Sequence, residues 1–179
     1  MKEYKNSVGD IWVSILGEPW ADVPVTDYNT IASMAVESLN YQDLITIDSH
    51  GARYSWDNIE TAPFNLPVSQ PDEVIMNVAS LFATAFPEGI VGQYSLWGSY
   101  GMKHDLENVM KKVGKIPYVS NGYGILGYIH YLVNVLGIDK RNLNKYVRKP
   151  FGLGHAKFEL NFVMVVPRLY GKTIGAIGR

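Results

Sequence analysis

The chain has 179 residues, of which 47% are hydrophobic, 12% aromatic and only 18% charged. This composition is typical of one folded domain with a sizeable core, and it excludes a disordered chain. The sequence has no cysteine, which excludes disulfides, thiolate chemistry and Cys-ligated zinc. The net charge of −1 conceals a division: residues 1–102 hold three Lys or Arg against thirteen Asp or Glu, and residues 103–179 hold thirteen against four.

The acidic half, residues 1–102, begins with a predicted helix and a predicted hairpin. Residues 26–29 are typical of a helix start, and the apolar spacing that follows predicts a helix over 27–39. Two β-prone runs, 44–47 and 54–56, flank a segment that supplies the Gly and Ser of a tight turn. We therefore expect an antiparallel hairpin there.

A second helix is predicted after the proline-containing segment. Ser69 or Gln70 can cap it, and Pro71 with two acidic residues suits its first turn. Its expected buried stripe consists of Val74, Val78, Leu81, Phe82 and Ala85. Residues 90–97 then predict a strand, and 98–101 predict a glycine-rich turn.

The basic half, residues 103–179, predicts three helices and a strand. An amphipathic helix is expected over 103–113, with a Glu107–Lys111 pair on its outer face. Two further helices are expected over 123–136 and 140–148. Alternation of apolar and polar residues over 158–164 predicts a half-buried strand.

These elements together predict the fold class. We expect a single α+β domain spanning 1–179, with a mixed or antiparallel sheet, four to five helices and a C-terminal αα-hairpin.

The αα-hairpin carries the most specific local pattern. Gly137 stands at its turn, and Leu132, Leu136, Ile138, Leu143 and Tyr146 stand where two helices would lock together. Residues 129–149 thus resemble the helix-turn-helix of repressor-type DNA-binding proteins, although Val133 stands where that family prefers Ala or Gly. The resemblance implies that the second helix faces outward to meet bases or phosphates. An ordinary αα-hairpin with a basic second helix is the alternative.

The basic residues of this region are the predicted contact residues, whether the partner is a nucleic acid or a protein. Long cations suit phosphate, and they equally suit an acidic protein surface. The acidic half could instead fold against this helix and neutralise it. The candidate contact residues are Lys140, Arg141, Asn142, Asn144, Lys145, Arg148 and Lys149.

Other motifs are less specific. Residues 122–127 match the GxGxxG string of dinucleotide-binding folds, but no acidic residue follows at the required distance, so we expect these glycines to permit close helix packing. Gly171–Thr173 lacks the first glycine of a phosphate-binding loop. The four histidines show no metal-ligand spacing, and only Asp48 with His50, and His104 with Asp105, bring acid and imidazole together.

These observations predict a structural or assembly subunit, in a setting such as the neck, tail or capsid of a bacteriophage-like virion. Low charge content and twelve tyrosines suit permanent contacts, and acidic and basic faces suit head-to-tail association into a homo-oligomer. A DNA-binding protein is the alternative, and an inhibitor or adaptor of a host protein is a second one. We expect no enzymatic activity, cofactor or metal.

The sequence also predicts a location in a virion or in the cytoplasm. The first six residues are followed by only a short apolar stretch, so we expect no signal peptide. The most apolar run, 123–136, is shorter than the roughly 20 residues that cross a bilayer, so we expect no membrane contact.

Overall fold

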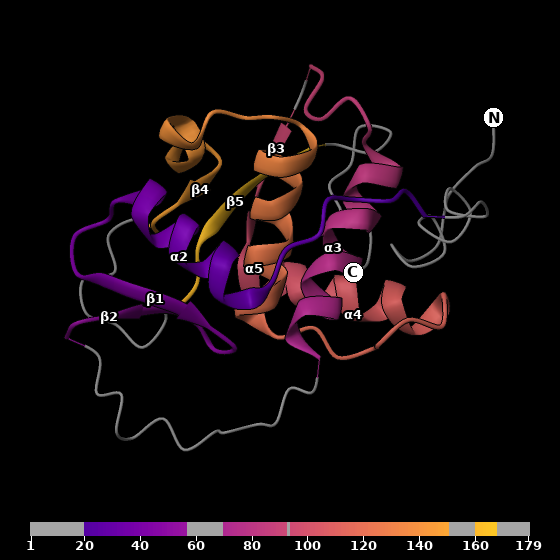
Figure 1. Cartoon of the computed structure of the whole chain (residues 1–179), viewed down its shortest axis with the longest axis horizontal. Coiled ribbons are helices and arrows are strands. Elements are labelled where there is room, and N and C mark those ends of the chain that lie inside the picture. Colours follow the sequence, from indigo (N-terminus) through magenta and orange to yellow (C-terminus); the bar gives the residue numbers. More distant parts are fainter. Residues whose placement is uncertain (1–19, 57–69, 93, 151–159, 168–179) are drawn as a thin grey trace.

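A computed structural model describes residues 20–56, 70–92, 94–150 and 160–167 (Figure 1). Its described elements follow one another in the order α2 (Tyr28–Leu39), β1 (Leu44–Asp48), β2 (Gly51–Tyr54), α3 (Pro71–Ala85), β3 (Tyr94–Gly98), α4 (Ser99–Lys112), α5 (Asn121–His130), the π-helix η2 (Tyr131–Val135), the 3-10 helix η3 (Lys140–Lys145), β4 (Val147–Arg148) and β5 (Val163–Pro167). The fold class is α+β, as the sequence predicts.

The strands form two small antiparallel sheets. Strands β1 and β2 make an antiparallel hairpin with Asp48 paired to Gly51 at its tip, but β2 spans Gly51–Tyr54 and not the predicted 54–56. The second sheet has the order β3-β5-β4, so that Met164 of β5 lies between Trp97 of β3 and Val147 of β4. Because β5 comes last in the described chain, this sheet joins segments that are distant in sequence.

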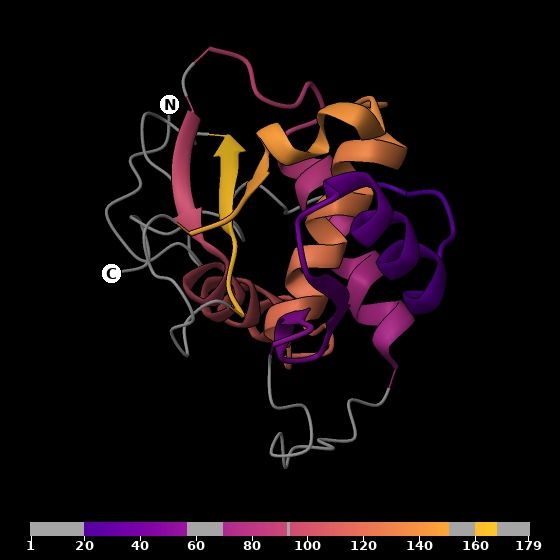
Figure 2. The ribbon, with the colours of Figure 1, turned by 90° about the vertical axis from the view of Figure 1, so that its left-hand side faces the viewer.

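Helix α5 is the centre of the molecule. All ten of its residues are buried, and it contacts α2, α3, α4 and the hairpin. Figure 2 shows α5 between the β3-β5-β4 sheet on one side and α2 and α3 on the other. The hydroxyl of Tyr128 donates a hydrogen bond to the carbonyl of Val165 at 2.6 Å, which satisfies a buried polar group and ties α5 to β5.

Glycines permit this dense packing, as the sequence predicts. A Cβ atom on Gly122 would lie 1.5 Å from the Asp48 carbonyl oxygen, and one on Gly127 would lie 2.4 Å from Cβ of Val78 in α3. Gly124 has ordinary space, because its nearest neighbour, Cγ1 of Val119, would be 3.5 Å away. Residues 116–120 form no strand before α5, so the strand of a dinucleotide-binding unit is missing there.

The predicted helices of the acidic half are confirmed. Asp27 caps α2, because its side chain accepts a hydrogen bond from the Thr30 amide at 2.8 Å. Pro71 opens α3, although Gln70 at the cap position has a positive φ and makes no side-chain cap bond. The buried stripe of α3 includes Val74, Val78, Leu81 and Phe82, whereas Ala85 is only half-buried.

Three expectations need correction around β3 and α4. The strand begins at Tyr94 and not at residue 90. The glycine-rich segment 98–101 is not a turn, because α4 already begins at Ser99, whose hydroxyl accepts a hydrogen bond from the Phe162 amide at 3.0 Å. Glu107 pairs with Lys103 and not with Lys111. Lys103 and Lys111 each lie one helical turn away from Glu107. Lys103 also contacts the rings of Tyr100 and Tyr118, which favour its position beside Glu107.

The predicted helix over 140–148 is also corrected. The chain forms the six-residue 3-10 helix η3 and then the short strand β4. Two asparagines lower the helix propensity of this segment. Pairing of Val147 with Met164 gives the chain an extended conformation, which a continuing helix cannot provide. Gly137 has φ +73°, so the glycine turn before η3 is present.

The last predicted strand, 158–164, lies partly outside the described residues. Its described part is irregular at 160–162, and β5 begins at Val163.

Candidate functional site

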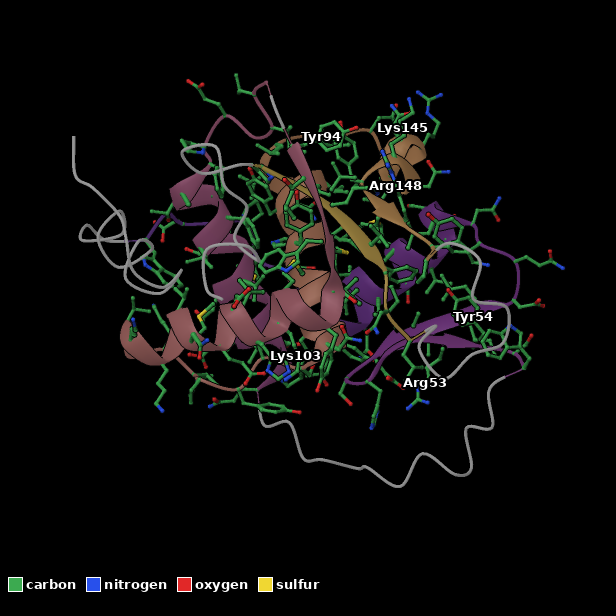
Figure 3. All side chains as sticks on the ribbon, turned by 180° about the vertical axis from the view of Figure 1, so that it is seen from behind. Arg53, Tyr54, Tyr94, Lys103, Lys145 and Arg148 are labelled. Atoms are coloured by element: carbon green, nitrogen blue, oxygen red, sulfur yellow. The ribbon has the colours of Figure 1, made fainter. Side chains whose placement is uncertain are left out.

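The seven predicted contact residues lie on a surface segment that we call the basic segment, Lys140–Lys149. Six of them are exposed and Arg148 is half-buried, while Leu143 and Val147 face the core. Figure 3 shows Lys145 and Arg148 together at one corner of the molecule, well away from Lys103. The structure therefore keeps the predicted cations on one continuous surface, although the helix expected to carry them is absent.

Local contacts hold both arginines of the segment. Arg141 Nη2 lies 2.7 Å from Asp139 Oδ2, and the same carboxylate accepts a hydrogen bond from the Arg141 amide at 2.9 Å. The hydrogen bonds from Arg141 hold the pKa of Asp139 at about 2, well below its ordinary value of 3.8. Arg148 Nε donates to the Lys145 carbonyl at 3.0 Å, at the end of η3. These arginines are therefore positioned before any partner binds.

Two tyrosines of the acidic half anchor the far end of the segment. The Tyr41 hydroxyl donates to the Val147 carbonyl at 2.5 Å. Lys149 Nζ lies 5.4 Å from the ring centroid of Tyr41 and 5.1 Å from that of Tyr54, within the range of cation–π attraction. Tyr54 in turn stacks on Trp56 with centroids 5.0 Å apart. Burial raises the pKa of Tyr41, so its hydroxyl stays protonated and able to donate.

The described part of the acidic half does not neutralise the basic segment through ion pairs. Within the described ranges, no salt bridge joins an acid of residues 20–102 to Lys140–Lys149. Lys140 and Lys145 are exposed and form no ion pair with any described residue. These two lysines are therefore available to a phosphate group or to a carboxylate of a partner protein.

A groove of about 640 Å³ runs between the end of α2 and η3. Its lining combines both charge signs with polar groups, and consists of Met34, Glu37, Ser38, Asn40, Lys140, Arg141 and Asn144. The Glu37 carboxylate on one wall would repel a phosphate bound to the other. A groove of this kind suits a partner that carries both charges.

Acidic residues collect at the opposite end of α2, and we call Asp27, Asp72 and Glu73 the acidic end. All three are exposed, and Asp72 Oδ1 accepts a hydrogen bond from the Tyr28 amide at 2.9 Å, which joins the starts of α2 and α3. Hydrogen bonding from Thr30 lowers the pKa of Asp27. Since an α-helix rises about 1.5 Å per residue, Asp27 of the acidic end lies about 15 Å along α2 from Glu37 of the groove.

The Asp48–His50 pair is brought together at the hairpin tip. His50 Nδ1 lies 3.6 Å from Asp48 Oδ1, and Asp48 Oδ2 lies 2.9 Å from Arg53 Nε. Ser49 Oγ approaches the same Nδ1 atom at 3.4 Å. Because the acid and the hydroxyl meet one ring nitrogen, the imidazole does not bridge them as it would in a nucleophilic triad. His104 instead lies edge-on to Tyr100, with centroids 4.6 Å apart.

A second cleft, which we call the tyrosine cleft, was not predicted from the sequence. It has a volume of about 570 Å³ and is lined by Ser49, His50, Tyr100, Lys103, Tyr118, Asn121, Leu160 and Asn161. These residues come from the hairpin tip, α4, the connection to α5, the start of α5 and the segment before β5, so no local motif could reveal them. Only His50 and the region of α4 carried any signal, through the acid–histidine neighbours Asp48 with His50 and His104 with Asp105.

Some sequence predictions concern features that the chain is expected to lack, and others concern residues outside the described ranges. No group of His, Asp or Glu suited to a metal ion occurs in the described part of the chain. None of the described helices combines the length and apolarity needed to span a membrane. His155 and Gly171–Thr173 lie outside the described residues.

No protein-family model, curated protein or solved structure matches this chain.

Proposed function

We propose that this chain is a structural or assembly subunit that contacts an acidic protein surface through its basic segment. The observation that carries the proposal is the exposure of Lys140 and Lys145, neither of which forms an ion pair within the described residues. The setting that we favour is a bacteriophage-like virion, in its neck, tail or capsid, or the cytoplasm where such particles assemble. Its low charge content and many tyrosines support this setting.

The mixed charge of the groove favours a protein partner over a polyphosphate. Glu37 and Asp139 lie beside Arg141 and Lys140, so a partner must satisfy both signs to bind there. Protein surfaces carry acids and bases side by side, whereas a nucleic acid backbone carries one sign only.

The positions of the two charged regions favour head-to-tail association of identical copies. The acidic end and the basic segment lie at opposite ends of α2, so the same pair of surfaces can recur from copy to copy. A contact between two different surfaces closes into a ring or extends into a tube, depending on the rotation between copies.

Sedimentation velocity at low and high salt tests this proposal. We expect association at low salt, because the contact is electrostatic, and dissociation as the salt concentration rises. Lys145→Glu should abolish association. Lys111→Glu reverses an equally exposed lysine on α4 and should leave it unchanged.

The acidic end has its own matched pair of variants. Glu73→Lys should weaken association, whereas Glu88→Lys, just beyond the opposite end of α3, should not. A wild-type chain that stays monomeric at high concentration and low salt would rule out self-assembly.

Nucleic-acid binding is the second candidate function. The exposed cations of the basic segment support it, although η3 and β4 stand in place of the second helix that the helix-turn-helix resemblance implies. Asn142 and Asn144 are exposed near Lys140 and Lys145 in sequence and could meet base edges. Replacing Arg141, Lys145 and Arg148 with Ala should then abolish binding of a fluorescent DNA duplex and flatten its salt dependence. Equal binding by the triple variant would exclude this function.

A further inference from the structure

The floor of the tyrosine cleft contains two asparagine side chains with defined orientations. Asn121 Nδ2 lies 2.9 Å from the His50 carbonyl, 3.3 Å from the Leu160 carbonyl and 2.9 Å from Asn161 Oδ1. Carbonyl oxygens can only accept, so the atom facing them must be the amide nitrogen. This fixes the orientation of Asn121, and with it that of Asn161.

The fixed orientations leave one acceptor and one donor of the lining residues without a hydrogen-bond partner among the described residues. Asn121 is 6% exposed, and its Oδ1 atom is shielded from water without a hydrogen-bond partner. Asn161 is half-buried, and its Nδ2 atom makes no hydrogen bond within the described residues. A buried acceptor without a partner is costly, so a ligand N–H that reaches Oδ1 through a small side-chain movement would be favoured.

The rim of the cleft is aromatic. Tyr100 is 53% exposed and Tyr118 is 40% exposed. Lys103 Nζ lies between them, 5.7 Å from the Tyr100 centroid and 5.4 Å from the Tyr118 centroid. Exposed tyrosine faces beside a cleft suit a flat ring that stacks on them.

The charges at the cleft are already compensated. Lys103 is paired with Glu107, and Asp48 behind His50 is paired with Arg53. No cation is left there among the described residues to hold a phosphate, and no carboxylate is left to hold an ammonium group. The chemistry of the cleft therefore selects an uncharged ligand.

We propose that the tyrosine cleft binds a small, uncharged, planar heterocycle whose edge presents an N–H beside a carbonyl. This is the lactam edge of a uracil-type or hypoxanthine-type base, taken as the free base or nucleoside. Its N–H meets Asn121 Oδ1, its carbonyl accepts from Asn161 Nδ2, and its ring stacks on Tyr118. The cleft volume of about 570 Å³ lies in the range usual for small-molecule sites. The proposal is independent of the assembly function.

Calorimetric titration of the full chain with nucleosides tests the proposal. Uridine and inosine both carry the lactam edge and should bind. N3-methyluridine, which lacks the N–H, and adenosine, which lacks the lactam edge, should each bind at least about tenfold more weakly. Equal binding of N3-methyluridine or adenosine would overturn the proposal, as would the absence of binding by both uridine and inosine.

A matched pair of tyrosine variants locates the site. Tyr118→Ala should weaken uridine binding about tenfold, because the stacking surface is lost. Tyr94→Ala removes a similarly exposed tyrosine on β3, 48% exposed, and should leave binding unchanged. Figure 3 shows Tyr94 at the opposite side of the molecule from Lys103. Full binding by Tyr118→Ala would exclude the cleft as the site. The nucleoside comparison uses the unaltered chain and does not depend on either variant folding.

Discussion

Gly122 of α5 and Asp48 of β1 lie so close together that a Cβ atom on Gly122 would stand 1.5 Å from the Asp48 carbonyl oxygen. Gly51 makes a similar approach, because a Cβ atom there would lie 2.1 Å from the Leu160 carbonyl oxygen. The first approach seats the hairpin tip on the start of α5, and the second seats it against the segment before β5. They set the positions of His50 and Asn121 at the tyrosine cleft.

Gly122→Ala should strongly destabilise the fold. The new methyl group cannot fit against a backbone carbonyl, so we expect a loss of about 3 kcal/mol or more in the free energy of unfolding. Gly124→Ala is the matched control in the same helix. Its Cβ would have ordinary space, so the better helix propensity of Ala should raise stability by up to about 1 kcal/mol. Urea denaturation measures both, and equal effects would contradict this account.

Tyr41→Phe should loosen the end of the basic segment. The change removes the hydrogen bond to the Val147 carbonyl but keeps the ring that faces Lys149. We expect a loss of about 1 kcal/mol in unfolding free energy. Tyr118→Phe, at an exposed position, should change it by less than about 0.5 kcal/mol. A neutral Tyr41→Phe variant would show that this bond does not hold the segment.

His130 should make stability depend on pH. It is buried, its Nε2 lies 2.6 Å from the Pro24 carbonyl, and its Nδ1 lies 2.8 Å from Asn134 Nδ2. Burial lowers its pKa below the ordinary 6.5, although the Pro24 bond opposes this. As the pH falls, His130 is therefore protonated at a higher pH in the unfolded chain than in the folded one. The free energy of unfolding should decrease as the pH drops below 6.5.

His130→Gln isolates that contribution. Glutamine can donate to the Pro24 carbonyl but does not titrate, so the variant should lack this part of the pH dependence. Urea midpoints measured across the pH range for both chains give the difference directly. Parallel curves would assign the dependence to other groups.

The Asp139 carboxylate should titrate at about pH 2 in the folded chain. Because the pKa is lowered in the folded chain, the carboxylate contributes its full stabilisation above pH 3.8, which is its ordinary pKa. This contribution disappears as the pH falls through about 2. Arg141→Gln removes the main hydrogen bonds and should move the pKa towards 3.8. Carboxyl NMR of the two proteins checks this, and an unchanged pKa in the variant would contradict the assignment.

The candidate sites were predictable to different degrees. The basic segment could be found from sequence, because its cations are adjacent and hydrophilic side chains stay at the surface wherever the backbone places them. Its conformation could not, since the pairing of Val147 with Met164 depends on a strand that follows in the chain. The tyrosine cleft could not be found either, because Tyr100, Asn121 and Asn161 carry no joint motif.

The sequence by itself determined the α+β class, α2, α3, α4, α5 and the hairpin, because capping residues and apolar periodicity act over a few neighbouring residues. It also determined that glycines would allow close packing around α5. Only the tertiary structure decided that η3 replaces the expected helix over 140–148, and that the acidic end and the basic segment lie at opposite ends of α2. These outcomes depend on contacts between residues far apart in the chain, which local propensity does not contain.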